Sequence, residues 1–176
     1  KRGARLNFSE AVNAGINASN TELFVVMNSD LIVSKNWLTA MVEKMETVDR
    51  LAACGVLSNC DSGWLINAPG KPQFSMTLEK SGLELRPGMK MEEITPNLED
   101  LYSFMEKSNV LNKGKYQPQK WVAAYCTIYA RSAVNEIGLF DPTYRNGCED
   151  LDHLLRIEKA YYSIGQALDS WVFHFG

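Results

Sequence analysis

Apolar and polar positions along the chain follow two periods, one typical of helices and one typical of buried strands. Phe8, Val12 and Ile16 recur at intervals of four, which predicts a helix over residues 5–19. Continuous apolar runs at 23–27, 51–57 and 121–130 predict strands that are buried on both faces. Further amphipathic spacing predicts helices at 36–48, 98–105, 132–137 and 149–160, before one or two short strands over 162–176. This alternation of elements predicts an α/β fold with a mostly parallel sheet flanked by helices.

The pattern is weakest over residues 67–118. Five of the six prolines of the chain fall in this segment, and only residues 98–105 have helical spacing. We therefore predict an irregular insertion with one short helix. Because 176 residues correspond to about one domain, we expect a single domain over residues 1–176 with this insertion inside it.

Composition and charge narrow the function classes. The chain has 45% hydrophobic and 22% charged residues, which is typical of globular proteins and excludes disorder or a collagen-like repeat. Its 18 basic and 21 acidic residues leave a net charge of -3, so there is no electrostatic reason to expect a nucleic acid as partner. An enzyme of this charge that binds anions would need a local device such as a metal ion.

The cysteines and the lengths of the apolar runs indicate in which cellular compartment we expect the protein. Cys54, Cys60, Cys126 and Cys148 form no C-x-x-C pair, so neither a zinc cluster nor a disulfide scaffold is indicated, and we expect inert thiols in a reducing compartment. The longest apolar run, 23–27, is far shorter than the roughly 20 residues that cross a bilayer, so we expect no transmembrane segment. We predict a cytoplasmic protein and leave peripheral attachment to a membrane open.

The first candidate for chemistry is Asn28-Ser29-Asp30, which follows the predicted strand 23–27. Ligands of open α/β sheets bind at the carboxyl ends of strands, so a carboxylate there would project into a cleft. Its oxygens suit Mg²⁺ or Mn²⁺ bridging a substrate diphosphate. The alternative is an ordinary turn and helix cap, for which this sequence is also typical.

The second candidate is an acidic cluster at the start of the predicted helix 149–160. Glu149, Asp150 and Asp152 could simply complement the positive end of the helix dipole, although three carboxylates also repel one another. A carboxylate held at a cleft can instead act as a general base toward a substrate hydroxyl. Asp152 lies four residues before Arg156, so a structural ion pair is the favoured role for that acid.

The third candidate is His174, which lies between aromatic residues near the end of the chain. A histidine in such a setting is more often a hydrogen-bonded core residue. Neutral imidazole also ligates Mn²⁺, which would give His174 a reason to end a strand facing Asp30.

In this order the motifs resemble the family 2 glycosyltransferases of the GT-A fold, in their rhamnosyltransferase-like branch. The first half of the resemblance is carried by Asn7-Phe8, Ala11, Asn13, Gly15, Phe24 to Asp30, and Trp37-Leu38. The second half is carried by Arg131, Gly138 to Asp141, Gly147 to Asp152, Arg156, and His174 to Gly176. Only the segment 67–118 has no counterpart in this pattern.

The resemblance implies donor and metal roles for four residues. Asp30 matches the last acid of the D-x-D motif, which holds the divalent ion on the nucleotide-sugar diphosphate. Asn28 occupies the position of the first acid, a departure that the rhamnosyltransferase-like members share. His174 matches the histidine that completes the metal site, and Asn13 matches a position near the nucleotide.

The resemblance also implies a catalytic pair. Asp150 matches the catalytic base of the family, and Glu149 is its neighbour in the same motif. Tyr161 replaces the glycine that usually follows the last long helix, which bears on that turn rather than on the chemistry.

The resemblance further implies that an N-terminal segment is missing. Family members begin with a strand, a helix and a strand that hold the nucleotide base, and we expect this chain to be truncated before them. A sheet edge exposed by missing strands would invite pairing with another copy, so we expect a homo-oligomer.

The function that follows is an inverting, metal-dependent glycosyltransferase of polysaccharide biosynthesis. It would use Mn²⁺ or Mg²⁺ to move a sugar from a UDP- or dTDP-linked donor to a saccharide or related hydroxyl acceptor. The alternative is a catalytically inactive glycosyltransferase-like fragment that binds a saccharide or a protein. A nucleotidyltransferase ranks last, because no glycine- and lysine-rich phosphate loop is visible.

Overall fold

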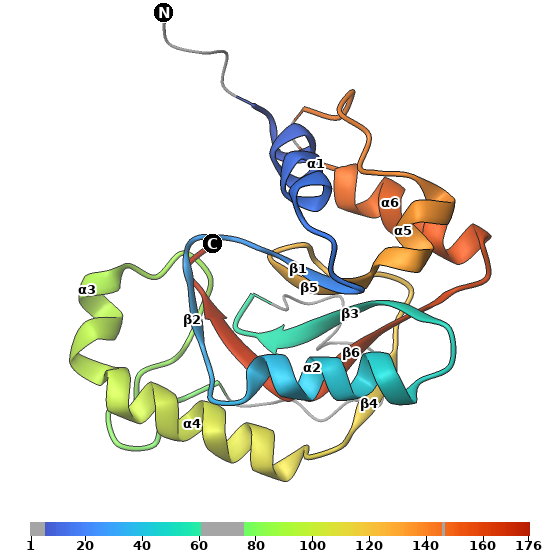
Figure 1. Ribbon diagram of the computed structural model, residues 1–176. Helices are drawn as coiled ribbons and strands as arrows, with labels where there is room; N and C mark the ends of the chain where they lie inside the picture. The colour runs from blue at the N-terminus through green and yellow to red at the C-terminus, as the bar shows by residue number, and fades with distance from the viewer. Residues whose placement is uncertain (1–5, 61–75, 146) are drawn as a thin grey trace, which may run out of the picture. The chain divides into compact units, whose positions relative to one another are not determined.

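The computed structural model describes residues 6–60, 76–145 and 147–176 (Figure 1). The helices are α1 (Phe8–Ala18), α2 (Trp37–Thr47), α3 (Met91–Ile94), α4 (Leu98–Leu111), α5 (Arg131–Ile137) and α6 (Glu149–Lys159), with a 3₁₀ turn η1 (Thr95–Asn97). The strands are β1 (Leu23–Met27), β2 (Leu31–Val33), β3 (Leu51–Ser58), β4 (Tyr116–Pro118), β5 (Cys126–Ala130) and β6 (Ser163–His174).

Most of the expected elements are present, and the differences are local. The α/β class, with helices flanking a sheet, is confirmed. The apolar run 121–130 becomes a strand only from Cys126, since Val122 is buried against Gly55 outside any strand. A continuous apolar run therefore reports burial, and strand pairing is a separate matter. The last 15 residues hold one long strand, β6, where we expected one or two short ones.

The described strands are ordered β1-β5-β3-β6-β2, with β4 beside β6. Three pairs have a defined register, and all three are antiparallel. Val25 of β1 lies opposite Ile128 of β5, Cys54 of β3 also lies opposite Ile128, and Leu31 of β2 lies opposite His174 of β6.

These three pairs differ from the mostly parallel pairing that we expected. β5 runs between β1 and β3 in the opposite direction to both, so these two strands share a direction without touching each other. The sequence did not reveal this because a strand covered on both faces has the same apolar run whichever way its neighbours point.

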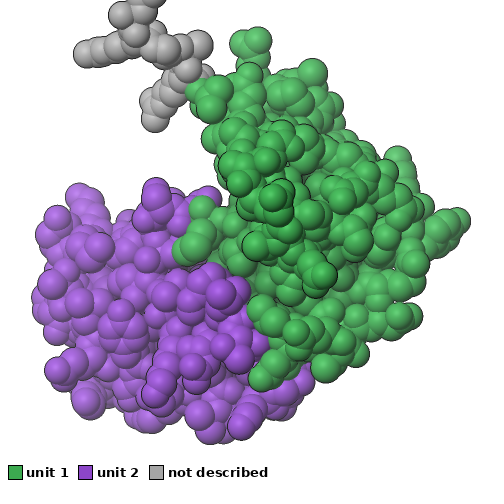
Figure 2. Space-filling model, viewed as in Figure 1, with its two compact units in different colours: residues 1–27, 41–55, 117–166 green, residues 28–40, 56–116, 167–176 purple. Residues whose placement is uncertain are grey.

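The chain divides into two compact units, coloured separately in Figure 2. Unit 1 holds residues 1–27, 41–55 and 117–166, and unit 2 holds residues 28–40, 56–116 and 167–176. The strands β3, β4 and β6 and the helix α2 contribute residues to both units. A single catalytic domain over residues 1–176 stays a prediction.

Unit 1 has a core built on β5 and α6. Tyr129 of β5 is fully buried, stacks on Phe24 at 5.7 Å between ring centroids, and meets Phe140 edge to face at 5.8 Å. Leu154 and Ile157 of α6 are buried in the same cluster. All of these residues except Phe140, which follows α5, come from elements that the apolar pattern predicts.

Unit 2 has a core of its own, which contains much of the segment that we expected to be irregular. Eight buried side chains form this core: Leu78, Leu85, Met89, Ile94, Leu101, Met105, Trp171 and Phe173. Six of them lie within 67–118, and α4 continues to Leu111 where we expected a helix ending at 105. Residues 67–75 of that segment lie outside the described residues.

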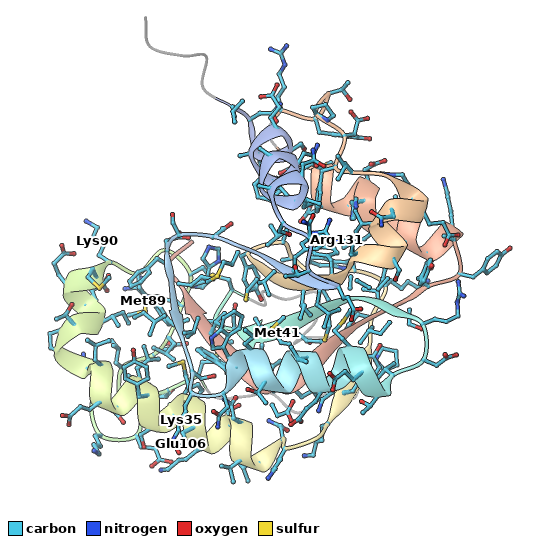
Figure 3. All side chains as sticks on the ribbon, in the orientation of Figure 1. Lys35, Met41, Met89, Lys90, Glu106 and Arg131 are labelled. Atoms are coloured by element: carbon cyan, nitrogen blue, oxygen red, sulfur yellow. The ribbon has the colours of Figure 1, made fainter. Side chains whose placement is uncertain are left out.

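The ends of α1 show how local sequence fixes the helices of unit 1. Asn7 caps the helix, since its side chain accepts from the Glu10 N–H while Glu10 accepts from the Asn7 N–H in return. At the other end Arg131, labelled in Figure 3, donates to the carbonyl of Ile16 and to the hydroxyl of Ser19. The two ends of α1 are thereby hydrogen-bonded.

Candidate functional site

Strand pairing in unit 2 brings the ends of two distant segments together. β2 begins at Leu31, directly after the Asn28-Ser29-Asp30 sequence, and Leu31 lies opposite His174 at the end of β6. The pairing continues past the strands, because the Phe175 N–H donates to the carbonyl of Asp30 at 3.2 Å.

The side chains at this point form a polar group of three. The Nε2 atom of His174 lies 3.4 Å from Oδ1 of Asp30 and 3.1 Å from Nδ2 of Asn28. The Asn28 amide nitrogen can donate to Nε2 when that ring nitrogen carries no proton. The His174 side chain is 11% exposed and that of Asp30 is 43% exposed, so solvent reaches the acid.

Asp30 and His174 fit a divalent cation as two of its ligands. Two ligands at right angles on an ion with bonds near 2.1 Å lie about 3 Å apart, close to the separation of Oδ1 and Nε2. Within the described residues no group of three or more His, Cys, Asp or Glu side chains could hold a metal. A two-ligand site suits Mg²⁺ or Mn²⁺, which complete their coordination with phosphate and water oxygens.

Asn59 is a residue of this region that the sequence analysis did not single out. It follows β3, is 2% exposed, and bonds through its side chain to both backbone groups of His174. The two residues are 115 positions apart, and the sequence around Asn59 indicates only a turn. Nothing in that sequence could have predicted the contact.

The acidic cluster of unit 1 lies at the first turn of α6. The helix begins after Gly147 and Cys148, which have φ values of 107° and 70° and so turn the chain into it. The Gly147 N–H donates to Oε2 of Glu149 at 2.8 Å. Glu149 therefore stabilises this turn. This is a structural role for one of the two acids that we predicted to be catalytic.

Asp150 is half-buried, and only one of its two carboxylate oxygens has a short hydrogen bond. Its Oδ1 accepts from the Leu151 N–H at 2.8 Å, and its Oδ2 lies 3.5 Å from the Ala124 nitrogen, at the limit of a hydrogen bond. Burial raises the pKa of the Tyr129 phenol, and the negative charge of Asp150 raises it further. The carboxylate of Asp150 can accept a proton from a group that approaches it.

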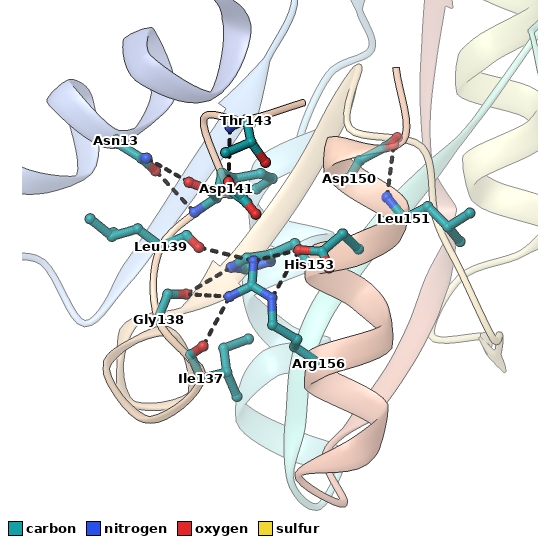
Figure 4. A network of polar contacts seen from close by, with 12 residues as sticks. Asn13, Ile137, Gly138, Leu139, Asp141, Thr143, Asp150, Leu151, His153 and Arg156 are labelled. Atoms are coloured by element: carbon teal, nitrogen blue, oxygen red, sulfur yellow. Dashed lines mark hydrogen bonds and ion pairs between the residues drawn. The ribbon is translucent and has the colours of Figure 1, made fainter. Parts of the chain in front are cut away.

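The predicted ion pair of α6 is present, and Figure 4 shows the network around it. Arg156 lies 2.9 Å from Asp152 and also donates to the carbonyls of Ile137 and Leu139 at 2.9 Å each. Asp152 thus orients the arginine that holds the turn after α5. The favoured role of Asp152, a structural ion pair, is confirmed.

His153, which the sequence analysis passed over, is fully buried beneath this network. Its ring stacks on Phe140 at 4.0 Å, and its Nε2 donates to the carbonyl of Gly138 at 3.3 Å, since a carbonyl can only accept. Burial lowers the pKa of His153 to about 4, with the positive charge of Arg156 acting in the same direction. The side chain is therefore neutral at pH 7.

The side chain of Asn13 is hydrogen-bonded to the backbone of unit 1. Its Nδ2 donates to the Phe140 carbonyl at 2.8 Å, and its Oδ1 accepts from the Phe140 N–H at 3.0 Å (Figure 4). This pairing attaches α1 to the turn after α5, and it uses both the oxygen and the nitrogen of the amide. Donor binding by Asn13 stays a prediction.

Comparisons with known proteins agree with this fold. The family model described as glycosyl transferase family 2 matches residues 1–137. This range contains Asn13, Asn28 and Asp30, whereas Glu149, Asp150 and His174 lie beyond it. No curated protein matches the sequence.

Among solved structures, the chain is similar to the crystal structure of GalNAc-T7 with UDP, GalNAc and Mn²⁺. The TM-score is 0.59 at 16% sequence identity, over 98% of this chain and 31% of that chain. This likeness confirms the expected GT-A type of fold, and the chain spans about a third of the length of the protein it matches. Among the described residues, no helix combines the length and apolar character needed to cross a bilayer.

Proposed function

The chain belongs to the family 2 glycosyltransferases, and we propose that it transfers a sugar from a nucleotide-diphosphate sugar to a hydroxyl of a saccharide acceptor, with a divalent metal and with inversion. The observation that carries the proposal is the group of Asp30, His174 and Asn28 at the ends of β2 and β6. A carboxylate oxygen and an imidazole nitrogen, 3.4 Å apart, are the donor set that the proposed metal needs.

Asp30 and His174 hold the cation in this proposal. A bound Mn²⁺ or Mg²⁺ supplies positive charge that neutralises the diphosphate as it departs. The Asn28 amide nitrogen lies 3.1 Å from Nε2 of His174. Because that ring nitrogen has a single lone pair, Asn28 would give up this contact when Nε2 binds the metal. The substitution of the first acid of the motif by Asn28 supports the rhamnosyltransferase-like branch of the family.

Asp150 is the general base in this proposal. Its carboxylate accepts the proton of the acceptor hydroxyl as that oxygen attacks the anomeric carbon, and a single displacement inverts that carbon. Glu149 assists by holding the Gly147 N–H, which fixes the turn that presents Asp150. Glu149 therefore acts on the position of the base rather than on the substrate.

The finer properties of the donor and the protein belong to the same proposal. The solved relative was crystallised with UDP, GalNAc and Mn²⁺, which supports a UDP-linked hexose and Mn²⁺ as the first donor and metal to test, ahead of dTDP-linked sugars and Mg²⁺. A role in polysaccharide biosynthesis, a cytoplasmic location and a homo-oligomer stay predictions.

The first experiment is a calorimetric titration of the chain with Mn²⁺ and UDP, and separately with Mn²⁺ and dTDP. We expect nucleotide binding that requires the metal and that Asp30→Ala removes. Asp49→Ala is the matched control, because Asp49 is an exposed acid distant in sequence from the polar group. Binding that is equal in the wild type and in Asp30→Ala would contradict the proposed donor site.

The alternative, a saccharide-binding or protein-binding module without catalysis, gives a different result. It predicts that neither nucleotide binds, with or without Mn²⁺. We keep this alternative because, among the described residues, no group of three or more His, Cys, Asp or Glu side chains could hold a metal ion. The proposed metal site therefore has only two ligands from the protein.

A further inference from the structure

The side chain of Asn59 bonds to the backbone of His174 in both directions. Its Oδ1 accepts from the His174 N–H at 2.7 Å, and its Nδ2 donates to the His174 carbonyl at 2.8 Å. Asn59 is 2% exposed, so these bonds are not open to competition from water. The amide thus replaces the pairing that a neighbouring strand would give at this position.

The same amide also reaches a third segment of unit 2. Its Nδ2 donates to the carbonyl of Arg86 at 3.1 Å, and nearby the Gly88 N–H donates to the carbonyl of Phe175 at 2.8 Å. The end of β6 is therefore attached to residues 86–88 at two points, of which one runs through Asn59.

His174 is the last residue of β6, so the regular pairing between strands ends at this position. On the β2 side the Phe175 N–H donates to the carbonyl of Asp30, and the backbone of His174 itself is held by Asn59. The direction of the imidazole depends on the direction of its Cα–Cβ bond, which these backbone bonds fix.

From these contacts we infer that Asn59 is a positioning residue: by clamping the N–H and the carbonyl of His174, it directs the imidazole nitrogen toward Asp30. Asn59 acts through the backbone of His174 and touches neither the metal nor the substrate. The inference rests on the proposed function for the use of that imidazole as a metal ligand.

The test compares the wild type with Asn59→Ala in two measurements. The first uses no metal and records long-range ¹H–¹⁵N spectra of the histidine rings at one fixed pH. The chain has two histidines, so His153 of unit 1 serves as an internal reference. We expect the ring signals of His174 to shift or split in Asn59→Ala while those of His153 stay in place.

The second measurement uses Mn²⁺ alone. Pulsed electron paramagnetic resonance detects ¹⁴N coupling when an imidazole nitrogen binds the ion, and His174→Ala gives the reference without it. We expect Asn59→Ala to weaken Mn²⁺ binding by about 10-fold or more, the effect typical of groups that orient a ligand, and to reduce the ¹⁴N coupling.

A matched control separates positioning from general destabilisation. Asn112 is another buried asparagine of unit 2, at 8% exposure, and its Nδ2 donates to the Ser108 carbonyl at 2.9 Å. We expect Asn112→Ala to leave the ring signals of His174 and the Mn²⁺ affinity unchanged. If Asn59→Ala does not fold, Asn59→Asp retains the size and the acceptor for the His174 N–H, and replaces the donor to the two carbonyls by a carboxylate oxygen that cannot bond to them.

The outcomes for the positioning role and for the proposed function are distinct. Ring signals and Mn²⁺ affinity equal to wild type in the Asn59 variant would overturn the positioning role, as would equal losses in Asn112→Ala. A wild type that shows no ¹⁴N coupling to Mn²⁺ would overturn the metal role of His174. In that case the metal-free ring spectra still decide whether Asn59 orients the imidazole.

Discussion

In unit 1 the candidate acids lie side by side on one helix, whereas in unit 2 the candidate metal group combines Asn28 and His174, which are 146 residues apart. The contacts of Glu149 and Asp150 are mostly to backbone N–H groups one or two residues away. Those of His174 come from two separate segments of the chain, one around residues 28–31 and one at Asn59. The comparison teaches that the acids depend on one helix start, whereas the imidazole depends on the packing of the whole of unit 2.

The largest expected effect tests whether these two groups have separate roles. Asp150→Asn removes the proposed base and keeps the shape of the side chain, so we expect sugar transfer to fall by about 10² to 10⁴-fold with Mn²⁺ binding unchanged. His174→Ala should instead lower the Mn²⁺ affinity. Transfer assays with a nucleotide sugar and Mn²⁺ titrations measure both effects.

Asp152→Asn is the matched control for the base. It changes an acid two positions along the same helix, which is engaged with Arg156, and we expect it to retain most of the transfer activity. Transfer in Asp150→Asn at the wild-type rate would rule out the assignment of the base.

A second pair of variants tests whether each unit has a core in its own right. Leu154 of unit 1 is 1% exposed and Leu101 of unit 2 is 0% exposed. We expect replacement of either leucine by alanine to lower the free energy of unfolding by about 2 to 5 kcal/mol, since both changes leave a cavity. Urea denaturation followed by circular dichroism measures the loss. A cost under about 1 kcal/mol for Leu101→Ala would show that the segment 76–118 forms no real core.

The buried histidine of unit 1 predicts a dependence of stability on pH. The folded pKa of His153, about 4, lies below its ordinary value of 6.5, so the unfolded chain binds more protons between these values. Stability contributed by neutral His153 is complete above pH 6.5 and is lost as the pH falls toward 4, by about 3 kcal/mol.

His153→Phe checks this dependence, because phenylalanine keeps a ring against Phe140 and does not titrate. Urea denaturation at several pH values between 7.5 and 4.5 should show a steeper fall for the wild type than for this variant. Parallel curves for the two proteins would contradict the low pKa of His153.

The smallest expected effect concerns the turn after α6. Tyr161 has a φ of 60° and is 86% exposed, so a residue with a side chain occupies a conformation that suits glycine. Tyr161→Gly should raise the free energy of unfolding by about 0.5 to 1 kcal/mol, the relief of left-handed strain less the added chain entropy. Tyr144→Gly, at an exposed position without a positive φ, should give no such gain in thermal denaturation.

The sequence predicted those parts of the fold that depend on short spacings. The strand β1 and the helix α5 lie within a residue of the expected bounds, because apolar period and run length are properties of neighbouring positions. The three-residue strands β2 and β4 were not expected, since so short a segment has no period of its own. The core of unit 2 was hidden by prolines that interrupt the pattern, although Leu101 and Met105 pack in it.

The candidate site divides in the same way. The Asp152–Arg156 pair follows from a spacing of four on one helix, which the sequence alone determines. Asp30 and His174 could be associated through metal-ligand chemistry and the family resemblance but through no spacing, and nothing in the sequence could have associated Asn59 with His174. Contacts between distant segments depend on strand register and packing, and these are set by the sum of many interactions across the sheet. The sequence by itself thus determined most of the helices and buried strands and the Asp152–Arg156 ion pair, whereas the tertiary structure decided which polar groups surround the imidazole of His174.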